Sequence, residues 1–138
     1  MAAFQKFNSF VEALAEKIHN LGADALALAL CAAANAPVAG NSVLANLTQI
    51  SYTNLSSRAL TTSSSSQTGG LYKLVLADKV LTASGGAVAA FRYIAIYNDT
   101  AASDELVGFY DYGSDLTLLD GETLTIDFDG TNGALTLQ

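Results

Sequence analysis

The chain has 138 residues, of which 51% are apolar and 14% are charged, and its formal net charge is −7. This length predicts one domain built on a single core, and the apolar fraction excludes an intrinsically disordered chain. The six Lys and Arg residues are too few to neutralise nucleic-acid phosphates or to hold an anionic membrane surface. We therefore expect neither nucleic acid nor a membrane as a partner.

The acidic residues gather toward the C-terminal end. Residues 99–138 contain nine of the 13 carboxylates and no Lys or Arg, whereas residues 1–98 hold four acids against all six bases. Charge of one sign at one end predicts attraction toward a basic partner, which speeds docking at low salt. The nine are Asp99, Asp104, Glu105, Asp111, Asp115, Asp120, Glu122, Asp127 and Asp129.

Few side chains in this sequence could carry reactive chemistry. Cys31 is the only cysteine and His19 the only histidine, which excludes an internal disulfide and a Cys or His metal cluster. Cys31 lies in the apolar run ALALALCAAA, which predicts a buried, unreactive thiol, and a lone thiol fits a reducing compartment. The first residues lack the apolar region of a signal peptide, and the apolar stretch at 25–34 is too short to span a bilayer.

An amphipathic helix is predicted over residues 3–21, with Gly22 as its terminator. Its apolar residues are spaced 3, 4, 3, 4 and 3, which is the pattern of a helix with one buried face. This stripe favours packing on the protein's own sheet, and a short coiled-coil contact between copies is the alternative. The stripe consists of Phe4, Phe7, Val11, Leu14, Ile18 and Leu21.

The middle of the chain predicts strands separated by loops. Alternation of Leu and Ala favours a strand over 24–32, followed by a loop over 35–41. Residues 42–50 fit either a short helix or an irregular edge segment. The Ser/Thr-rich segment 52–68 predicts a solvated edge strand that ends at Gly69-Gly70, and strands follow over 71–83 and 90–99.

Strands are also predicted over 105–113, 114–120, 122–130 and 133–138. Asp120-Gly121 and Asn132-Gly133 lie between alternating segments, which is a hairpin signal. About seven or eight short strands without helical spacers predict a mainly β fold. We expect a single domain over 1–138, a jelly-roll-like antiparallel β-sandwich with an N-terminal amphipathic helix.

The sequence does not predict an enzyme or a cofactor. His19 is expected at the surface or as a helix cap, and the acid pairs Asp104/Glu105, Asp111/Asp115 and Asp127/Asp129 are expected to be solvated carboxylates rather than a general acid and base. The run DFDGTNG at 127–133 has oxygens that could bind Ca²⁺, and a tight turn explains it equally well. The Phe and Tyr residues between 91 and 112 fit a core with an interface rim.

Three segments resemble the small structural proteins of tailed bacteriophages, and most of all the head cement (decoration) proteins. They are FQKFNSFVEALAEKIHNLGAD at 4–24, YKLVLADKVLTASGGAVAAFRYIAIYND at 72–99 and LVGFYDYGSDLTLLDGETLTIDFDGTNGALTL at 106–137. The resemblance rests on the strand pattern, the YND turn and the terminal DG…DFDG hairpin. Residues 30–68 depart from it.

The resemblance implies a virion protein, made in the host cytoplasm, that binds the capsid exterior and stabilises it across capsomer seams. Its partners would be the major capsid protein and further copies of itself, as a homodimer or alternatively a trimer. A tail or head-fibre component, or a carbohydrate-binding β-sandwich module, is the alternative. The expected contact residues lie on the helix and on the Ser/Thr-rich edge, and they are Phe4, Phe7, Val11, Leu14, Arg58, Leu60 and Thr62.

Overall fold

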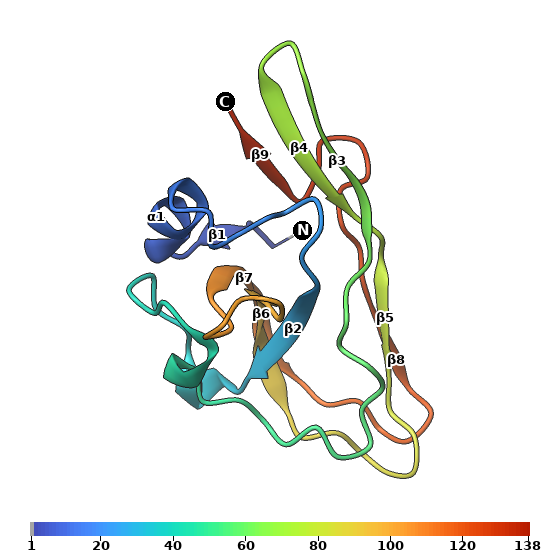
Figure 1. The fold of residues 1–138 in the computed structure, drawn as a ribbon. Helices are drawn as coiled ribbons and strands as arrows, with labels where there is room; N and C mark the ends of the chain where they lie inside the picture. The colour runs from blue at the N-terminus through green and yellow to red at the C-terminus, as the bar shows by residue number, and fades with distance from the viewer. Residues whose placement is uncertain (1) are drawn as a thin grey trace.

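The structure is a computed structural model that describes residues 2–138, and its fold is mainly β with antiparallel sheets (Figure 1). A four-stranded sheet has the order β1 (Gln5–Lys6), β7 (Leu106–Leu116), β6 (Phe91–Asn98), β2 (Leu26–Cys31). A three-stranded sheet has the order β3 (Thr62–Thr68), β4 (Leu71–Leu76), β9 (Leu135–Leu137), and β5 (Lys79–Thr82) pairs with β8 (Thr123–Ile126). One α-helix, α1 (Ser9–Ala15), and two 3₁₀ turns, η1 (Ala33–Asn35) and η2 (Leu44–Asn46), complete the described elements.

Strand β2 is buried along its whole length, and this explains its alternation of large and small residues. Leu26, Leu28 and Leu30 join the main core, whereas Ala27 and Ala29 belong to a second cluster on the opposite face of the same sheet. Because successive side chains of a strand point to opposite faces, the Leu/Ala period matches two different packing partners. The strand predicted over 24–32 is confirmed.

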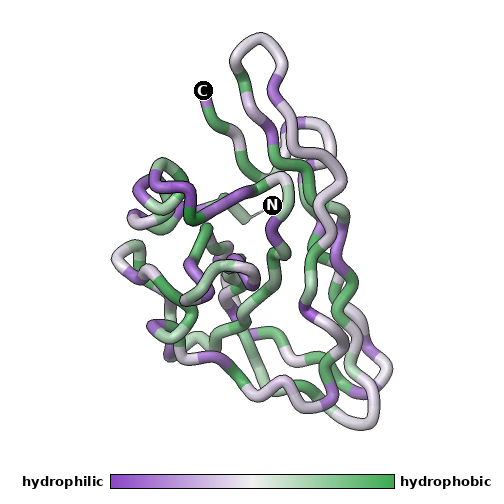
Figure 2. Tube along the Cα trace, in the orientation of Figure 1, coloured by the Kyte–Doolittle hydropathy of each residue, from purple (hydrophilic) through white to green (hydrophobic). Residues whose placement is uncertain are grey.

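The main core lies between the four-stranded sheet and the layer formed by β3–β4–β9 and β5–β8. Leu74, Leu76 and Leu81 of this second layer are buried with Leu28 and Ile96 of the central sheet. In Figure 2 the hairpin formed by β3 and β4 extends beyond this interior, and its tip is mostly of intermediate hydropathy, drawn in white. Two packed layers around one core are the expected solution for sheets with one apolar face each.

The opposite face of the central sheet is covered by the segment that follows β2. Leu44 and Leu47 pack against the cluster that contains Ala27, Ala29 and Phe109. Residues 42–50, which fitted either a short helix or an irregular segment, contain only the 3₁₀ turn η2 at Leu44–Asn46 and are otherwise irregular. Small side chains on this face of β2 allow the irregular segment to approach closely.

The free edge of β2 is covered by backbone rather than by a regular strand. Leu28 N donates to Arg58 O (3.0 Å), Leu60 N donates to Leu26 O (2.9 Å), and Ile50 N donates to Leu30 O (2.9 Å). Residues 50–60 therefore satisfy the edge of the central sheet and leave it no hydrogen-bonding surface there.

The helix predicted over 3–21 is wrong in its length. Residues 5 and 6 pair with β7 as β1 instead, and α1 spans only Ser9–Ala15. The buried residues of the helix are Phe10 and Ala13, whereas Val11 is 50% exposed. Phe4 and Phe7 precede the helix, so the regular spacing joined residues that belong to different elements.

Lys17 ends the helix, and Gly22 does not. Lys17 has φ 68°, and the backbone bonds Ile18 N to Ala13 O (2.8 Å) and Lys17 N to Leu14 O (3.3 Å) form a Schellman motif. This position usually carries glycine, because a Cβ is strained in the left-handed region. Because this residue is a lysine, the sequence did not indicate that the helix ends here.

The predicted end of the Ser/Thr-rich strand at Gly69-Gly70 is confirmed, whereas the two predicted hairpins are wrong. Gly69-Gly70 joins β3 to β4 as a two-residue loop with positive φ at both glycines. Asp120-Gly121 and Asn132-Gly133 do not form the expected hairpins, because β8 pairs with β5 and β9 pairs with β4. The strand predicted over 114–120 is also wrong, since β7 continues to Leu116.

Replacing Lys17 with glycine should stabilise the fold by about 1 kcal/mol, because glycine relieves the strain of the left-handed conformation. Urea denaturation of Lys17→Gly and of Lys17→Ala measures this effect. The alanine variant removes the same charge and keeps the strain, so it should resemble the natural protein. A glycine variant no more stable than the alanine variant would contradict the assignment of the helix end.

Candidate functional site

A groove of about 480 Å³ opens between the central sheet and strand β8. Its walls are mostly apolar, and Phe4 closes one side by lying over Gly108, where any Cβ would collide with the phenyl ring. Phe4 also contacts Tyr110, with 5.5 Å between ring centroids. The lining includes Phe4, Ile94, Tyr110, Tyr112 and residues 124–129.

The free edge of β8 forms one rim of this groove. Ala83 N donates to Glu122 O (3.0 Å), and Ala83 and Glu122 continue the register in which Leu81 faces Leu124. Alternation along an antiparallel pair then directs the N–H and C=O of Thr125 away from β5. Thr125 lines the groove, and its exposed side chain alternates with those of Leu124 and Ile126, which pack on the core.

The electrostatics of the groove are acidic. Asp127 is exposed, and Asp129 accepts hydrogen bonds from Thr131 N (2.9 Å) and Asn132 N (2.7 Å). The bonds from Asn132 are the main cause that lowers the pKa of Asp129, which keeps this carboxyl ionised. Burial raises the pKa of Tyr110 to about 12, so its hydroxyl stays neutral.

The run at 127–133, for which the sequence allowed either a Ca²⁺ loop or a tight turn, is a turn closed by Asp129.

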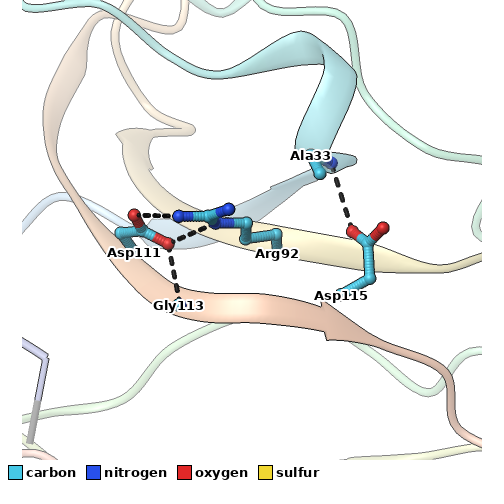
Figure 3. Close-up of polar contacts among 5 residues, drawn as sticks. All are labelled: Ala33, Arg92, Asp111, Gly113 and Asp115. Carbon is cyan, nitrogen blue, oxygen red and sulfur yellow. Dashed lines mark hydrogen bonds and ion pairs between the residues drawn. The ribbon is translucent and has the colours of Figure 1, made fainter.

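An ion pair links β6 to β7 on the central sheet (Figure 3), next in sequence to Tyr112, which lines the groove. Arg92 donates twice to Asp111, at 2.7 and 2.9 Å, and Gly113 N donates to the same carboxylate at 2.8 Å. This pairing lowers the pKa of Asp111. The register of β6 and β7 shifts here, so that Phe91 faces Leu116 and Tyr93 faces Asp111. The extra residues of β7 bulge outward, and Tyr112 is 49% exposed.

Strand β3 offers a second free edge. Within residues 2–138 it pairs only with β4, which confirms the predicted Ser/Thr-rich edge strand over 62–68, whereas residues 52–61 of the predicted range form no regular strand. The two-residue loop makes Thr68 and Leu71 a hydrogen-bonded pair, so by alternation Ser65 and Gln67 direct their backbone N–H and C=O away from β4. Figure 1 shows this hairpin standing out from the body of the molecule.

The expected contact residues have different environments, and one of them is excluded. Phe7 is 0% exposed and lies in the core, so it cannot reach a partner's surface as predicted. The sequence placed it in the apolar stripe of a helix over 3–21, whereas it precedes α1 and packs against Phe109 with 5.0 Å between ring centroids. Val11 is exposed, and the remaining five, Phe4, Leu14, Arg58, Leu60 and Thr62, are half-buried.

Arg58 is engaged within the chain. Its guanidinium lies 3.7 Å from the centroid of the Tyr52 ring and donates to Leu28 O. This stacking and hydrogen bonding anchor residues 50–60 along β2. The predicted site residues therefore do not converge on one surface, and the groove beside β8 was not predicted. The sequence showed its parts only as two separate features, the tyrosines at 110 and 112 and the carboxylates at 127 and 129.

His19 is buried, at 4% exposure, and the prediction of a surface or capping role is wrong. Asn98 Oδ1 accepts from Thr100 N and Ala101 N, which turns its Nδ2 toward His19 Nδ1 (3.0 Å) and Asp24 Oδ2 (2.6 Å). Nδ1 must then accept, so the imidazole is neutral with its proton on Nε2. Burial lowers the pKa of His19, against the smaller opposing effects of Glu105 and Asp24.

Cys31 is fully buried, and burial raises the pKa of its thiol to about 11. The predicted burial is confirmed, and a thiol with this pKa is a poor nucleophile at neutral pH. Among residues 2–138, no three His, Cys, Asp or Glu side chains are arranged to hold a metal ion. Within the same residues, no helix has the length and apolar character needed to cross a membrane.

Comparisons of the chain with protein-family models, with curated proteins and with solved structures gave no significant match.

His19 should make stability depend on pH. Its folded pKa lies below the unfolded value of 6.5, so the unfolded chain binds more protons and the free energy of unfolding falls as pH drops below about 6.5. Urea denaturation at several pH values between 8 and 5 should show this loss in the natural protein and a smaller loss in His19→Gln, which has no titrating group. Parallel profiles for the two proteins would contradict the buried neutral imidazole.

Proposed function

We propose that the chain is a virion structural protein, a cement protein that binds the outside of a tailed-phage capsid and stabilises it across capsomer seams. The observation that carries this proposal is the β3–β4 hairpin, which stands out from the two-layer body and ends in a polar, unpaired strand edge. A projecting edge can add a strand to a neighbouring chain. The resemblance of residues 4–24, 72–99 and 106–137 to head cement proteins supports the same function.

A cement protein stabilises a shell by adding buried area between subunits that the filled head pushes apart. Each contact can be weak, because many copies on one lattice act together. The exposed Val11 of α1 and the edge of β3 are the contact elements in this proposal. The jelly-roll-like course of the strands and self-association as a homodimer, with a trimer as the alternative, are parts of the proposal.

The edge of β3 allows a specific test of capsid binding. Heads stripped of the protein should burst at lower temperature than intact heads, and added natural protein should restore them. Gln67→Pro should fail to restore them, because proline removes an N–H that faces away from β4. Gln67→Ala keeps that N–H and should restore them as the natural protein does.

Two results would contradict this account. Stripped heads as stable as intact heads would exclude a cement role. Copy number in purified particles separates the alternatives, because a cement protein should approach the abundance of the major capsid protein. A tail or head-fibre component would be present in far fewer copies, and that result would favour the alternative.

A further inference from the structure

We propose that the groove beside β8 binds an extended segment of a partner protein that adds a strand to β8, places apolar side chains against Tyr110 and Ile94, and directs Lys or Arg side chains toward Asp127. This inference does not depend on capsid binding, because it concerns only the free edge of β8, the apolar hollow and the charge beside it.

The backbone of β8 supplies the first argument. Its pairing with β5 uses the hydrogen-bonding groups of Leu124 and Ile126, and it leaves those of Thr123 and Thr125 on the opposite edge. Phe128 N donates to Asp78 Oδ1 (3.0 Å), so the alternation continues past the strand and directs the backbone of Asp127 to the free edge. An extended segment could pair with these three residues in register.

The hollow next to this edge supplies the second argument. Side chains of an added strand alternate between its two faces, and those on the inner face would meet Phe4, Tyr110 and Phe128. The volume of about 480 Å³ lies within the range of about 300–1,000 Å³ that is usual for pockets that bind ligands. Apolar side chains at every second position of the partner would therefore find a preformed site.

Charge supplies the third argument and selects the partner. Among residues 2–138, no Lys or Arg lines the groove, whereas Asp127 and Asp129 both do. Lys73 lies nearby: its Nζ donates to Thr131 O (3.2 Å) and its charge helps to lower the pKa of Asp129, so Asp127 is the carboxylate that selects a basic partner. A second copy would fit less well, because antiparallel pairing of two β8 edges around Thr125 would place Asp127 of each copy opposite Thr123 of the other and would leave both carboxylates without a basic partner. A segment that carries Lys or Arg at those positions is attracted instead.

Binding of a peptide pool to the isolated protein tests the proposal. The probe is a pool of capped nonapeptides with Val, Ile, Leu, Phe or Tyr at odd positions and Lys or Arg at even positions. At millimolar total concentration the pool should shift the NMR amide signals of Thr123, Thr125 and Asp127. A pool with Glu in place of Lys and Arg is the matched control and should bind at least tenfold more weakly.

Variants of one residue separate the backbone from the side chain. Thr125→Pro removes the free-edge N–H and should weaken binding by roughly fivefold to tenfold, the loss expected for one hydrogen bond of about 1 kcal/mol. Thr125→Val keeps the N–H and should bind as the natural protein does, since this side chain is exposed on the other face. Asp127→Asn should weaken binding severalfold and reduce its dependence on salt.

A change in the peptides, rather than in the protein, tests the same hydrogen bonds if Thr125→Pro fails to fold. N-methylation of the peptides at alternate residues removes their backbone donors and should abolish the amide shifts in the natural protein. The proposal is overturned if the basic pool leaves the three amides unshifted, if the Glu pool binds equally well, or if the N-methylated peptides bind as tightly as the unmodified ones.

Discussion

The burial of strand β2 on both faces is the constraint on which the rest of the structure depends. Its leucines pack into the main core and its alanines pack under the segment that contains η2. Burying a leucine side chain contributes about 1.5–3 kcal/mol, so the large residues provide most of the stabilisation and the small ones permit close approach. A larger side chain at Ala29 would force the covering segment away, at a cost of about 1–3 kcal/mol.

In this fold the outer edge of β2 in the central sheet is fully hydrogen-bonded, whereas strand edges in the facing layer remain unpaired. Residues 50–60 cover β2, with Arg58 held by Tyr52 and by Leu28 O. The facing layer is divided into β3–β4–β9 and β5–β8, and each part ends in strands without a second neighbour. The hairpin edge of β3 and the groove edge of β8 are therefore consequences of the same architecture. Both proposals above place partners at these edges.

Local sequence patterns predicted the elements that depend on local physics. The Leu/Ala alternation gave β2, the aromatic alternation at 90–99 gave β6, and Gly69-Gly70 gave the end of β3. The pairing of β5 with β8 and of β4 with β9 joins segments more than forty residues apart, and no turn signal specifies such contacts. The helix failed because Phe4 and Phe7 continue its spacing by chance and because Lys17 takes a conformation that usually marks glycine. The groove combines residues from β7, β8 and the N-terminal segment, so its parts were visible in the sequence but their meeting was not.

Amide hydrogen exchange of the free protein is the most direct test of a closed centre with open strand edges. The amides of Ala29 and Leu28, which bond to β6 and to Arg58 O, should exchange only through global unfolding. The amides of Gln67 and Thr125, which face away from their only neighbouring strands, should exchange at rates close to those of an unfolded chain. Strong protection of Gln67 and Thr125 in the monomer, or rapid exchange of Ala29, would contradict the account.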